Sequence, residues 1–243
     1  MNGVVAGVAA VGLAAGGLYY ASRWPTSQLF GRTLVAGADP REVALTFDDG
    51  PNDAATPLLL EVLARHDVRA TFFTMGDFAR LRPDIVREVV AAVHLLANHT
   101  MSHPMLSMEP AARVWQELAD CSALLEDIAG VAVRHFRPPF GARRPAVLRI
   151  ARELGLIPVM WNVTGYDWNP IGAEGILNNL KAGIARNQGQ GRASNVLLHD
   201  GGHRGMGTSR MDTVRAVERL ISKLNGTAVK FVTVDAWGAH TPS

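Results

Sequence analysis

From residue 41 onward the sequence alternates short apolar segments with longer amphipathic ones. The apolar segments are rich in β-branched and aromatic residues, which is typical of buried strands. They lie at residues 43–47, 70–74, 131–136, 157–163, 195–199 and 230–234. The amphipathic segments have helical spacing and lie at residues 56–66, 83–97, 110–128, 145–154, 175–187 and 211–224. This repeated strand–helix order predicts an α/β fold with a mainly parallel sheet, either open or closed into a barrel.

The length and composition fit one such domain. The 243 residues are enough for one large core, and 48% apolar residues let the chain bury enough surface to fold. The formal charge is only +2 and there is no run of basic residues, which argues against nucleic-acid binding. The single cysteine, Cys121, excludes an intramolecular disulfide and a thiolate metal cluster, and we expect it to be buried on a helix.

The N-terminal segment is apolar enough to be a membrane anchor. Residues 4–21 contain no charged side chain, and at about 1.5 Å per residue a helix of this length just crosses a hydrocarbon core of about 30 Å. Tyr19, Tyr20 and Trp24 lie at its far end, where aromatic side chains favour a membrane interface. We therefore expect a transmembrane-like helix at residues 1–24, as an anchor or an uncleaved signal segment.

Reactive side chains follow several predicted strands, at the C-terminal ends where parallel α/β folds collect their active sites. Asp48 and Asp49 come directly after the first strand. Adjacent carboxylates at a strand end can aim in different directions, so one can bind a metal while the other handles protons. Taken alone, Asp-Asp-Gly-Pro is also a good turn sequence, so the strand is expected to end there.

His99 and His103 stand four residues apart, which lets two imidazoles converge on one metal if the segment makes a helical turn. Pro104 disfavours helical geometry at His103, so we expect a tight loop or a single turn. The pair lacks the neighbouring Glu that zincins use as a base, so the base must come from elsewhere. Asp48 or Asp49 is the obvious supplier.

Residues 137–141 (Arg-Pro-Pro-Phe-Gly) follow another predicted strand. The paired prolines stiffen this loop, and Gly141 frees the backbone to turn. Such a loop could hold Arg137 against a carboxylate and present a backbone N–H to an oxyanion.

Asp167 and Trp168 follow the strand-like segment 157–163, and His199 ends the segment 195–199. A histidine beside a buried carboxylate is a better acid than an isolated one. His203 follows in a glycine-rich loop, which we interpret as a candidate substrate contact. The histidines interpreted as structural or solvent-facing are His66, His94, His135 and His240.

Together these features form an ordered set: Thr-Phe-Asp-Asp-Gly at 46–50, His-x-x-x-His at 99–103, Arg-Pro-Pro-Phe-Gly at 137–141, Asp-Trp at 167–168 and Leu-Leu-His at 197–199. The set resembles the five ordered motifs of NodB-type polysaccharide deacetylases (carbohydrate esterase family 4). The resemblance implies a distorted (β/α) barrel with fewer than eight regular strands. It spans residues 41–237, which we expect to form a deacetylase domain, preceded by a linker at residues 25–40 and followed by a tail at residues 238–243.

The resemblance also implies residue roles. Asp49, His99 and His103 would bind a metal, usually zinc, although cobalt or nickel also suits two imidazoles and one carboxylate. Asp48 would be the general base and His199 the general acid.

Further residues would support this machinery. Arg137 would orient Asp48, and Asp167 would tune His199. Trp168 and Leu197 would line the pocket for the acetyl methyl group. The substrate-contacting residues would be Pro139, Phe140, Trp168 and Leu197.

The sequence departs from the family pattern at three places. Val93 precedes His94 where Gly is common, and the fourth motif keeps only its second acid, Asp167. Phe140 stands where Tyr is common. These departures affect a loop and substrate contacts more than the reaction.

The implied activity is metal-dependent hydrolysis of N-acetyl groups on a GlcNAc-containing polysaccharide that is peptidoglycan-like or chitin-like. The alternatives are an O-acetyl esterase of the acetylxylan type, a deacylase of a lipid-linked sugar, and a catalytically inactive carbohydrate-binding domain. The expected partners are the acetylated glycan and the membrane, with no nucleic acid and no protein partner.

Two arguments about the cellular location of the domain point in opposite directions. Arg23 and Arg32 follow the apolar segment, so the positive-inside rule alone favours a cytoplasmic domain. A glycan substrate favours the extracytoplasmic side, which is our prediction; cleavage of the N-terminal segment would give a secreted protein.

Overall fold

The computed structural model describes residues 16–17 and 19–240. Most of the predicted anchor, residues 1–15 and 18, lies outside these residues, so the anchor stays a prediction. Within the described part of the chain, no helix has both the length and the apolar character needed to span a bilayer.

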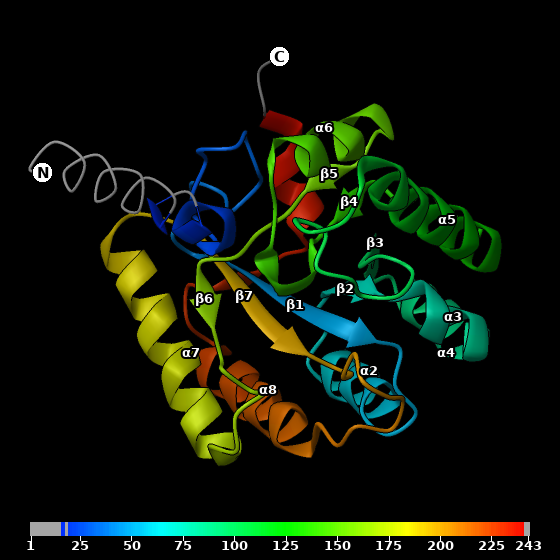
Figure 1. Ribbon diagram of the computed structural model, residues 1–243. Helices are drawn as coiled ribbons and strands as arrows, with labels where there is room; N and C mark the ends of the chain where they lie inside the picture. Colours follow the sequence, from blue (N-terminus) through cyan, green and yellow to red (C-terminus); the bar gives the residue numbers. More distant parts are fainter. Residues whose placement is uncertain (1–15, 18, 241–243) are drawn as a thin grey trace, which may run out of the picture.

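The centre of the fold is a curled sheet in which every strand pairing is parallel (Figure 1). The strands are β1 (Glu42–Gly50), β2 (Thr71–Thr74), β3 (Leu95–Asn98), β4 (His135–Phe136), β5 (Ile157–Pro158), β6 (Val163–Thr164), β7 (Ser194–His199) and β8 (Lys230–Phe231). Their order is β5-β4-β3-β2-β1-β7-β6, and β8 pairs with β1. The predicted α/β class with a parallel sheet is confirmed.

The two ends of this strand order belong to one stretch of chain. Residues 157–163 were expected to form one strand, but the structure divides them into β5, which pairs with β4, and β6, which pairs with β7. Between the two, the N–H of Met160 donates to Leu34 and that of Asn162 donates to Asn195 (2.8 and 3.1 Å). The segment therefore crosses from one end of the curled sheet to the other, which a single regular strand could not do.

The helices surround the curled sheet (Figure 1). They are α2 (Thr56–Arg65), α3 (Gly76–Leu81), α4 (Pro83–Ala91), α5 (Ala111–Ala129), α6 (Pro145–Glu153), α7 (Gly172–Gly189) and α8 (Met211–Leu224), with 3-10 turns η1 (Pro139–Gly141) and η2 (Val234–His240). The bounds of α8 agree with the prediction because its apolar positions keep a clear helical period. Cys121 is buried on α5, as expected.

Strand β1 separates two cores. Leu45 and Phe47 pack with α2, α7 and α8 on the outer face, where full burial of each such side chain contributes about 1.5–3 kcal/mol. Ala44 faces the inside of the curl with Trp237 of η2. Because side chains alternate along a strand, Thr46 and Asp48 share the inner face with Ala44. The inner face therefore turns polar toward the C-terminal end of β1.

The predicted helix at residues 83–97 was wrong in its second half. Helix α4 ends at Ala91, and Leu95–Asn98 form β3 against β2. Val93 has a left-handed backbone (φ 61°), which stops the helix, and the buried His94 accepts a hydrogen bond from the N–H of Ala70 through Nδ1 (3.3 Å). The apolar run 89–96 fits either period, so the helix and the strand behind it were merged. Two smaller differences concern α3, which was not predicted, and the predicted strand 131–136, of which only the last two residues form a strand, β4.

Val93→Gly is expected to raise the free energy of unfolding by about 1 kcal/mol. A β-branched residue is strained at positive φ, whereas glycine adopts this region freely. The side chain of Val93 is 62% exposed, so its removal loses little packing. Urea unfolding measures the effect, with Val131→Gly as the matched control at another exposed valine. A loss of stability in both variants would contradict the strain argument.

Candidate active site and metal-ligand cluster

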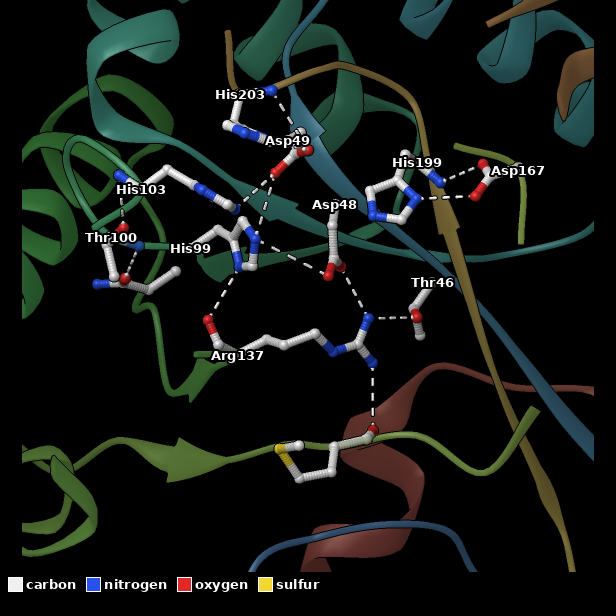
Figure 2. A network of polar contacts seen from close by, with 12 residues as sticks. Thr46, Asp48, Asp49, His99, Thr100, His103, Arg137, Asp167, His199 and His203 are labelled. Carbon is white, nitrogen blue, oxygen red and sulfur yellow. Dashed lines mark hydrogen bonds and ion pairs between the residues drawn. The ribbon is translucent and has the colours of Figure 1, made fainter. Parts of the chain in front are cut away.

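The predicted site residues meet at the C-terminal ends of the parallel strands (Figure 2). They lie at the end of β1, in the loops that follow β3, β4 and β6, and at the end of β7. The residues brought together from these positions are Asp48, Asp49, His99, His103, Arg137, Asp167 and His199.

A bulge in β1 aims both carboxylates at one place. The predicted turn after Phe47 was wrong, because β1 continues to Gly50 with a register shift between Asp48 and Gly50. In a regular strand two adjacent side chains point to opposite faces. The positive φ of Asp49 (70°) breaks this alternation, and both carboxylates are 3% exposed beside the ring of His99. Position 50 requires glycine, because a Cβ there would overlap the carboxylate of Asp200.

Three side chains form the metal-ligand cluster. Oδ1 of Asp49 lies 3.1 Å from Nε2 of His103 and 3.4 Å from Nε2 of His99. One ligand atom from each residue lies within 4.8 Å of the other two. The segment between the histidines is a tight loop, as expected, with positive φ at Thr100 and His103 (71° and 60°).

The protonation of the cluster suits a cation. Nδ1 of His99 lies 2.9 Å from the carbonyl oxygen of Arg137, so this nitrogen must donate, which leaves the lone pair on Nε2. Burial alone would raise the pKa of Asp49, but contacts with His103, His203 and His99 hold that pKa well below its usual value. Within the described residues Oδ1 of Asp49 is buried without a hydrogen bond. An anionic oxygen facing two imidazole nitrogens fits a divalent metal site.

Helix α5 holds the histidine loop from behind. The carboxylate of Glu117, which is 1% exposed, accepts from the N–H and the hydroxyl of Ser102 (2.9 and 2.7 Å). Oδ1 of Asn98 accepts from the N–H of Thr100, whose hydroxyl accepts from the N–H of His103 (2.7 and 3.0 Å). These bonds satisfy the loop backbone and fix both imidazoles. Nothing local in the sequence marks Glu117, because it lies on a helix that is remote from every motif.

Arg137 is fully buried and binds one oxygen of Asp48. Its Nη1 donates to Oδ1 of Asp48 (2.7 Å) and to the hydroxyl of Thr46 (2.6 Å), and its Nη2 lies 3.3 Å from Oδ1 of Asn195. The other oxygen of Asp48, Oδ2, lies 3.9 Å from Nε2 of His99. Arg137 therefore fixes the carboxylate with its second oxygen facing the cluster.

His199 and the buried Asp167 form a second pair. Nδ1 of His199 lies 2.8 Å from Oδ1 of Asp167. The other carboxylate oxygen of Asp167, Oδ2, accepts from the backbone N–H of His199 and from the hydroxyl of Thr213 (2.8 and 2.9 Å). Burial lowers the pKa of His199, but the charge and hydrogen bond of Asp167 outweigh burial and raise that pKa to about 9, with help from Asp49 and Asp48. The imidazole is therefore protonated at neutral pH. Figure 2 shows its ring lying between Asp167 and Asp48.

Two of the four predicted substrate-contacting residues lie at the exposed rim of the site, and the other two are buried in its wall. The half-exposed ring of Phe140 lies edge-on to His103 (4.7 Å between centroids), and that of Trp168 lies edge-on to His199 (5.4 Å). Pro139 is buried in η1, and Leu197 is buried on β7 two residues before His199, on the same face of the strand. Phe140 has a left-handed backbone (φ 58°).

His203 belongs to the cluster more closely than the sequence indicated. Its ring stacks on that of His103 (4.4 Å, 11°), and its backbone N–H donates to Oδ2 of Asp49 (3.3 Å). Its only sequence signal is the glycine-rich loop after His199. Asp200, which follows His199 directly, is buried and accepts from the hydroxyl of Thr56 (2.6 Å), and burial raises its pKa to about 7.

Comparison with known proteins agrees with this geometry. The family model for polysaccharide deacetylase matches residues 36–159. A chitooligosaccharide deacetylase of Bradyrhizobium sp. (strain ANU 289) is 40% identical over 76% of this chain and 84% of its own length. A peptidoglycan-N-acetylglucosamine deacetylase of Bacillus cereus is 34% identical over 79% of this chain and 66% of its own length.

Comparison with solved structures indicates the same family. The Bc1960 peptidoglycan N-acetylglucosamine deacetylase superposes with a TM-score of 0.75 at 31% identity, over 84% of this chain and 91% of that chain. BA3943, a pseudoenzyme of carbohydrate esterase family 4 from Bacillus anthracis, superposes with the same TM-score at 25% identity, over 85% of this chain and 68% of that chain. The chain therefore belongs to the polysaccharide deacetylase family, carbohydrate esterase family 4.

Proposed function

We propose that this protein hydrolyses N-acetyl groups on GlcNAc residues of a chitin-like or peptidoglycan-like glycan. The observation that carries the proposal is the state of Asp48: Arg137 binds one of its oxygens while the other faces the metal-ligand cluster. A carboxylate held in this way has a free lone pair at the place where a water molecule would be activated. Chitooligosaccharide and peptidoglycan deacetylases among the relatives support the same substrate class.

Asp49, His99 and His103 would hold the metal, which we propose is zinc, with cobalt or nickel as chemically suitable substitutes. When bound, the ion supplies a Lewis acid that acidifies water and polarises the acetyl carbonyl.

The protein residues would divide the proton transfers. Asp48 accepts the proton from the attacking water, and Arg137 keeps its carboxylate in position. His199 donates a proton to the leaving amine, because Asp167 keeps its ring protonated. The backbone N–H of Phe140 would donate to the oxyanion. Acetate and a free amino sugar are the products.

The substrate would enter between Phe140 and Trp168, which form the rim. Leu197 and Trp168 would enclose the acetyl methyl group, with Pro139 in the wall behind Phe140. This arrangement would select a small acyl group, because the wall is apolar and buried. A glycan of this kind lies outside the cytoplasm, so we also propose an extracytoplasmic domain held by the N-terminal segment.

The alternatives make different demands on the site. O-acetyl hydrolysis needs the same base and metal but a weaker acid, because an alkoxide leaves more readily than an amine anion. An inactive binding domain is a real alternative, because BA3943 is a pseudoenzyme with this fold. A structural metal would need neither the Asp48–Arg137 pair nor the His199–Asp167 pair, and both are in place here.

The test is acetate release from a panel of substrates. The protein is stripped with a chelator, reloaded with zinc, cobalt or nickel, and assayed on chitooligosaccharides, peptidoglycan and acetylxylan. Release from the first two in the reloaded protein and none in the stripped protein is expected. Release from acetylxylan alone would replace the proposal with the esterase, and no release by the metal-loaded protein from any substrate would support the inactive domain.

Asp167→Asn is expected to shift the alkaline limb of kcat/KM to lower pH and to lower kcat by about tenfold. The pKa of His199 is higher in the folded protein than in the unfolded chain. The His199–Asp167 pair therefore stabilises the protein fully below about pH 6.5, and this stabilisation is lost as pH rises toward 9. The variant lacks this contribution, so its stability deficit should shrink between pH 6.5 and 9. Asp212→Asn, at an exposed acid on the same helix as Thr213, is the control. An unchanged pH profile in Asp167→Asn would contradict the assigned role.

A further inference from the structure

Arg143 is a buried cation that the proposed reaction does not use. It is 1% exposed, which places it beside Arg137 among the largest fully buried side chains. Among the described residues its side chain forms no ion pair with a carboxylate, and burial lowers its pKa to about 10, so it stays protonated at neutral pH. A charge is buried only where strong hydrogen bonds compensate the loss of water. The hydrogen-bond partners of Arg143 therefore decide what this side chain does.

These partners are backbone carbonyl oxygens from two parts of the chain. One belongs to the loop after β4, where Nη1 donates to the oxygen of Gly141 (3.0 Å). The others belong to residues 22–27: Nη1 also donates to Ser22 (3.4 Å), and Nη2 donates to Trp24 and Ser27 (both 2.7 Å). The backbone N–H of Arg143 donates to Ser22 as well (3.0 Å). Because a guanidinium is planar and its donors have fixed directions, these bonds set the position of one segment relative to the other.

The loop that Arg143 binds is the one that carries Phe140. Phe140 and Gly141 both have a left-handed backbone (φ 58° and 64°). A phenylalanine keeps this conformation only where its surroundings hold it there. On one side the ring of Trp161 lies so close that a Cβ at position 141 would come within 2.8 Å of it. On the other side Arg143 binds the carbonyl of Gly141, so the turn is held between Trp161 and residues 22–27.

Residues 22–27 reach the histidine loop as well. Nη1 of Arg23 lies 3.9 Å from Sδ of Met105, two residues after His103. The ring of His103 in turn contacts that of Phe140. Residues 22–27, the loop after β4 and the histidine loop therefore form one continuous set of contacts beside the metal-ligand cluster.

We propose that Arg143 is a positioning residue for the reaction, which fixes the backbone of Phe140 by attaching its loop to residues 22–27. The inference rests on the proposed function and extends it, because it makes the N-terminal segment part of the active-site structure. The N–H of Phe140 would meet the oxyanion only in the transition state, so a displaced loop lowers kcat and leaves KM nearly unchanged. Detachment of residues 22–27 from Arg143 would lower turnover in the same way.

Arg143→Lys tests the proposal with a variant that keeps the charge. A lysine ammonium is a compact point charge, so it cannot bond Gly141 and all the carbonyls of residues 22–27 together. In the metal-loaded protein, kcat for acetate release from a chitooligosaccharide should fall about tenfold, while KM stays within about twofold. Arg143→Met removes every side-chain bond and should lower kcat about a hundredfold, so lysine partly restores what methionine loses. The pH profile should keep its wild-type limbs, because Asp48 and His199 are unchanged.

Folding is separated from positioning by comparing kcat per folded protein. Arg143→Met also leaves buried carbonyls without donors and loses stability, which makes Arg143→Lys the deciding variant. Arg149→Gln, at an exposed arginine of α6 that pairs with Glu153, should have the wild-type kcat. Wild-type kcat in folded Arg143→Lys, or a loss that appears in KM alone, would overturn the positioning role.

Limited trypsin digestion of the full-length protein tests the attachment without reference to activity. The peptide bond after Arg23 lies within the segment that Arg143 holds, so it should be cleaved at least about tenfold faster in Arg143→Lys than in the wild type. Arg149→Gln should be cleaved at the wild-type rate. Faster cleavage in Arg143→Lys supports the attachment even if no protein releases acetate, which would reject only the proposed function. Equal cleavage rates reject the attachment, whatever the proteins release.

Discussion

The Asp48→Asn protein is expected to keep its metal and to lose at least about a hundredfold in kcat. An amide keeps the shape of the side chain, and Asp49, His99 and His103 supply the ligand atoms without it. An amide oxygen is a very weak base, so the proton of the attacking water has no acceptor. Metal content by atomic emission and acetate release on one sample give both readouts.

The same change has a cost in stability that must be separated from catalysis. Arg137 is fully buried, and Asp48 is the carboxylate bound to it, so the variant leaves a buried guanidinium with only neutral partners. Removing one partner of a buried ion pair typically costs about 3–5 kcal/mol. Activity is therefore compared below the melting transition of the variant, with Asp67→Asn at an exposed aspartate as the control. Full turnover by folded, metal-loaded Asp48→Asn protein would show that another group is the base.

The meeting of four of the five motifs could be predicted from the sequence because each follows a predicted strand of a parallel sheet. Parallel strands put their C-terminal ends on one edge, so residues after 43–47, 131–136 and 195–199 converge without any detailed geometry. The positions of Asp48 and Arg137 relative to one another follow from that rule. The position of His99 does not, because β3 before it was predicted as helix.

The bulge at Asp49 could not be predicted in this way. Its carboxylate reaches the site only through a positive φ, and Asp-Asp-Gly-Pro has the composition of an ordinary turn. The strand Leu95–Asn98 was missed for a related reason: its apolar residues continue the helical spacing of α4, and the break is a left-handed valine, which is not a usual helix stop.

The supporting residues lie beyond the reach of local patterns. Glu117 acts on the histidine loop from a helix, and its role exists only once α5 packs behind β3. The split of residues 157–163 into β5 and β6 depends on where β4 and β7 lie, which is a tertiary property. The sequence therefore located the predicted site residues, including Arg137 beside Asp48 and Asp167 beside His199, but did not indicate the residues that hold the histidine loop.

His103→Ala is expected to lose the metal and all measurable acetate release. Two ligands remain, and since changes to groups behind the ligands already cost about 10–100-fold in metal affinity, loss of a ligand should cost more than about a hundredfold. Zinc affinity by competition with a chromophoric chelator measures this without reference to activity. His66→Ala, at a histidine far from the cluster in the sequence and on the C-cap of α2, should bind zinc as the wild type does.

His203→Ala decides which histidine is the ligand. The rings of His103 and His203 are stacked, and both lie near Asp49, but only Nε2 of His103 approaches Oδ1 together with His99; Nδ1 of His203 lies 3.6 Å from the other oxygen, Oδ2. His203→Ala should therefore retain zinc with an affinity reduced by about tenfold, because it loses a neighbour and not a ligand. If His203→Ala released the zinc and His103→Ala kept it, the ligand set would be Asp49, His99 and His203. The tight loop that aims His103 at the cluster favours the first result, since its positive φ values and its bonds to Asn98, Thr100 and Glu117 serve to hold that imidazole in place.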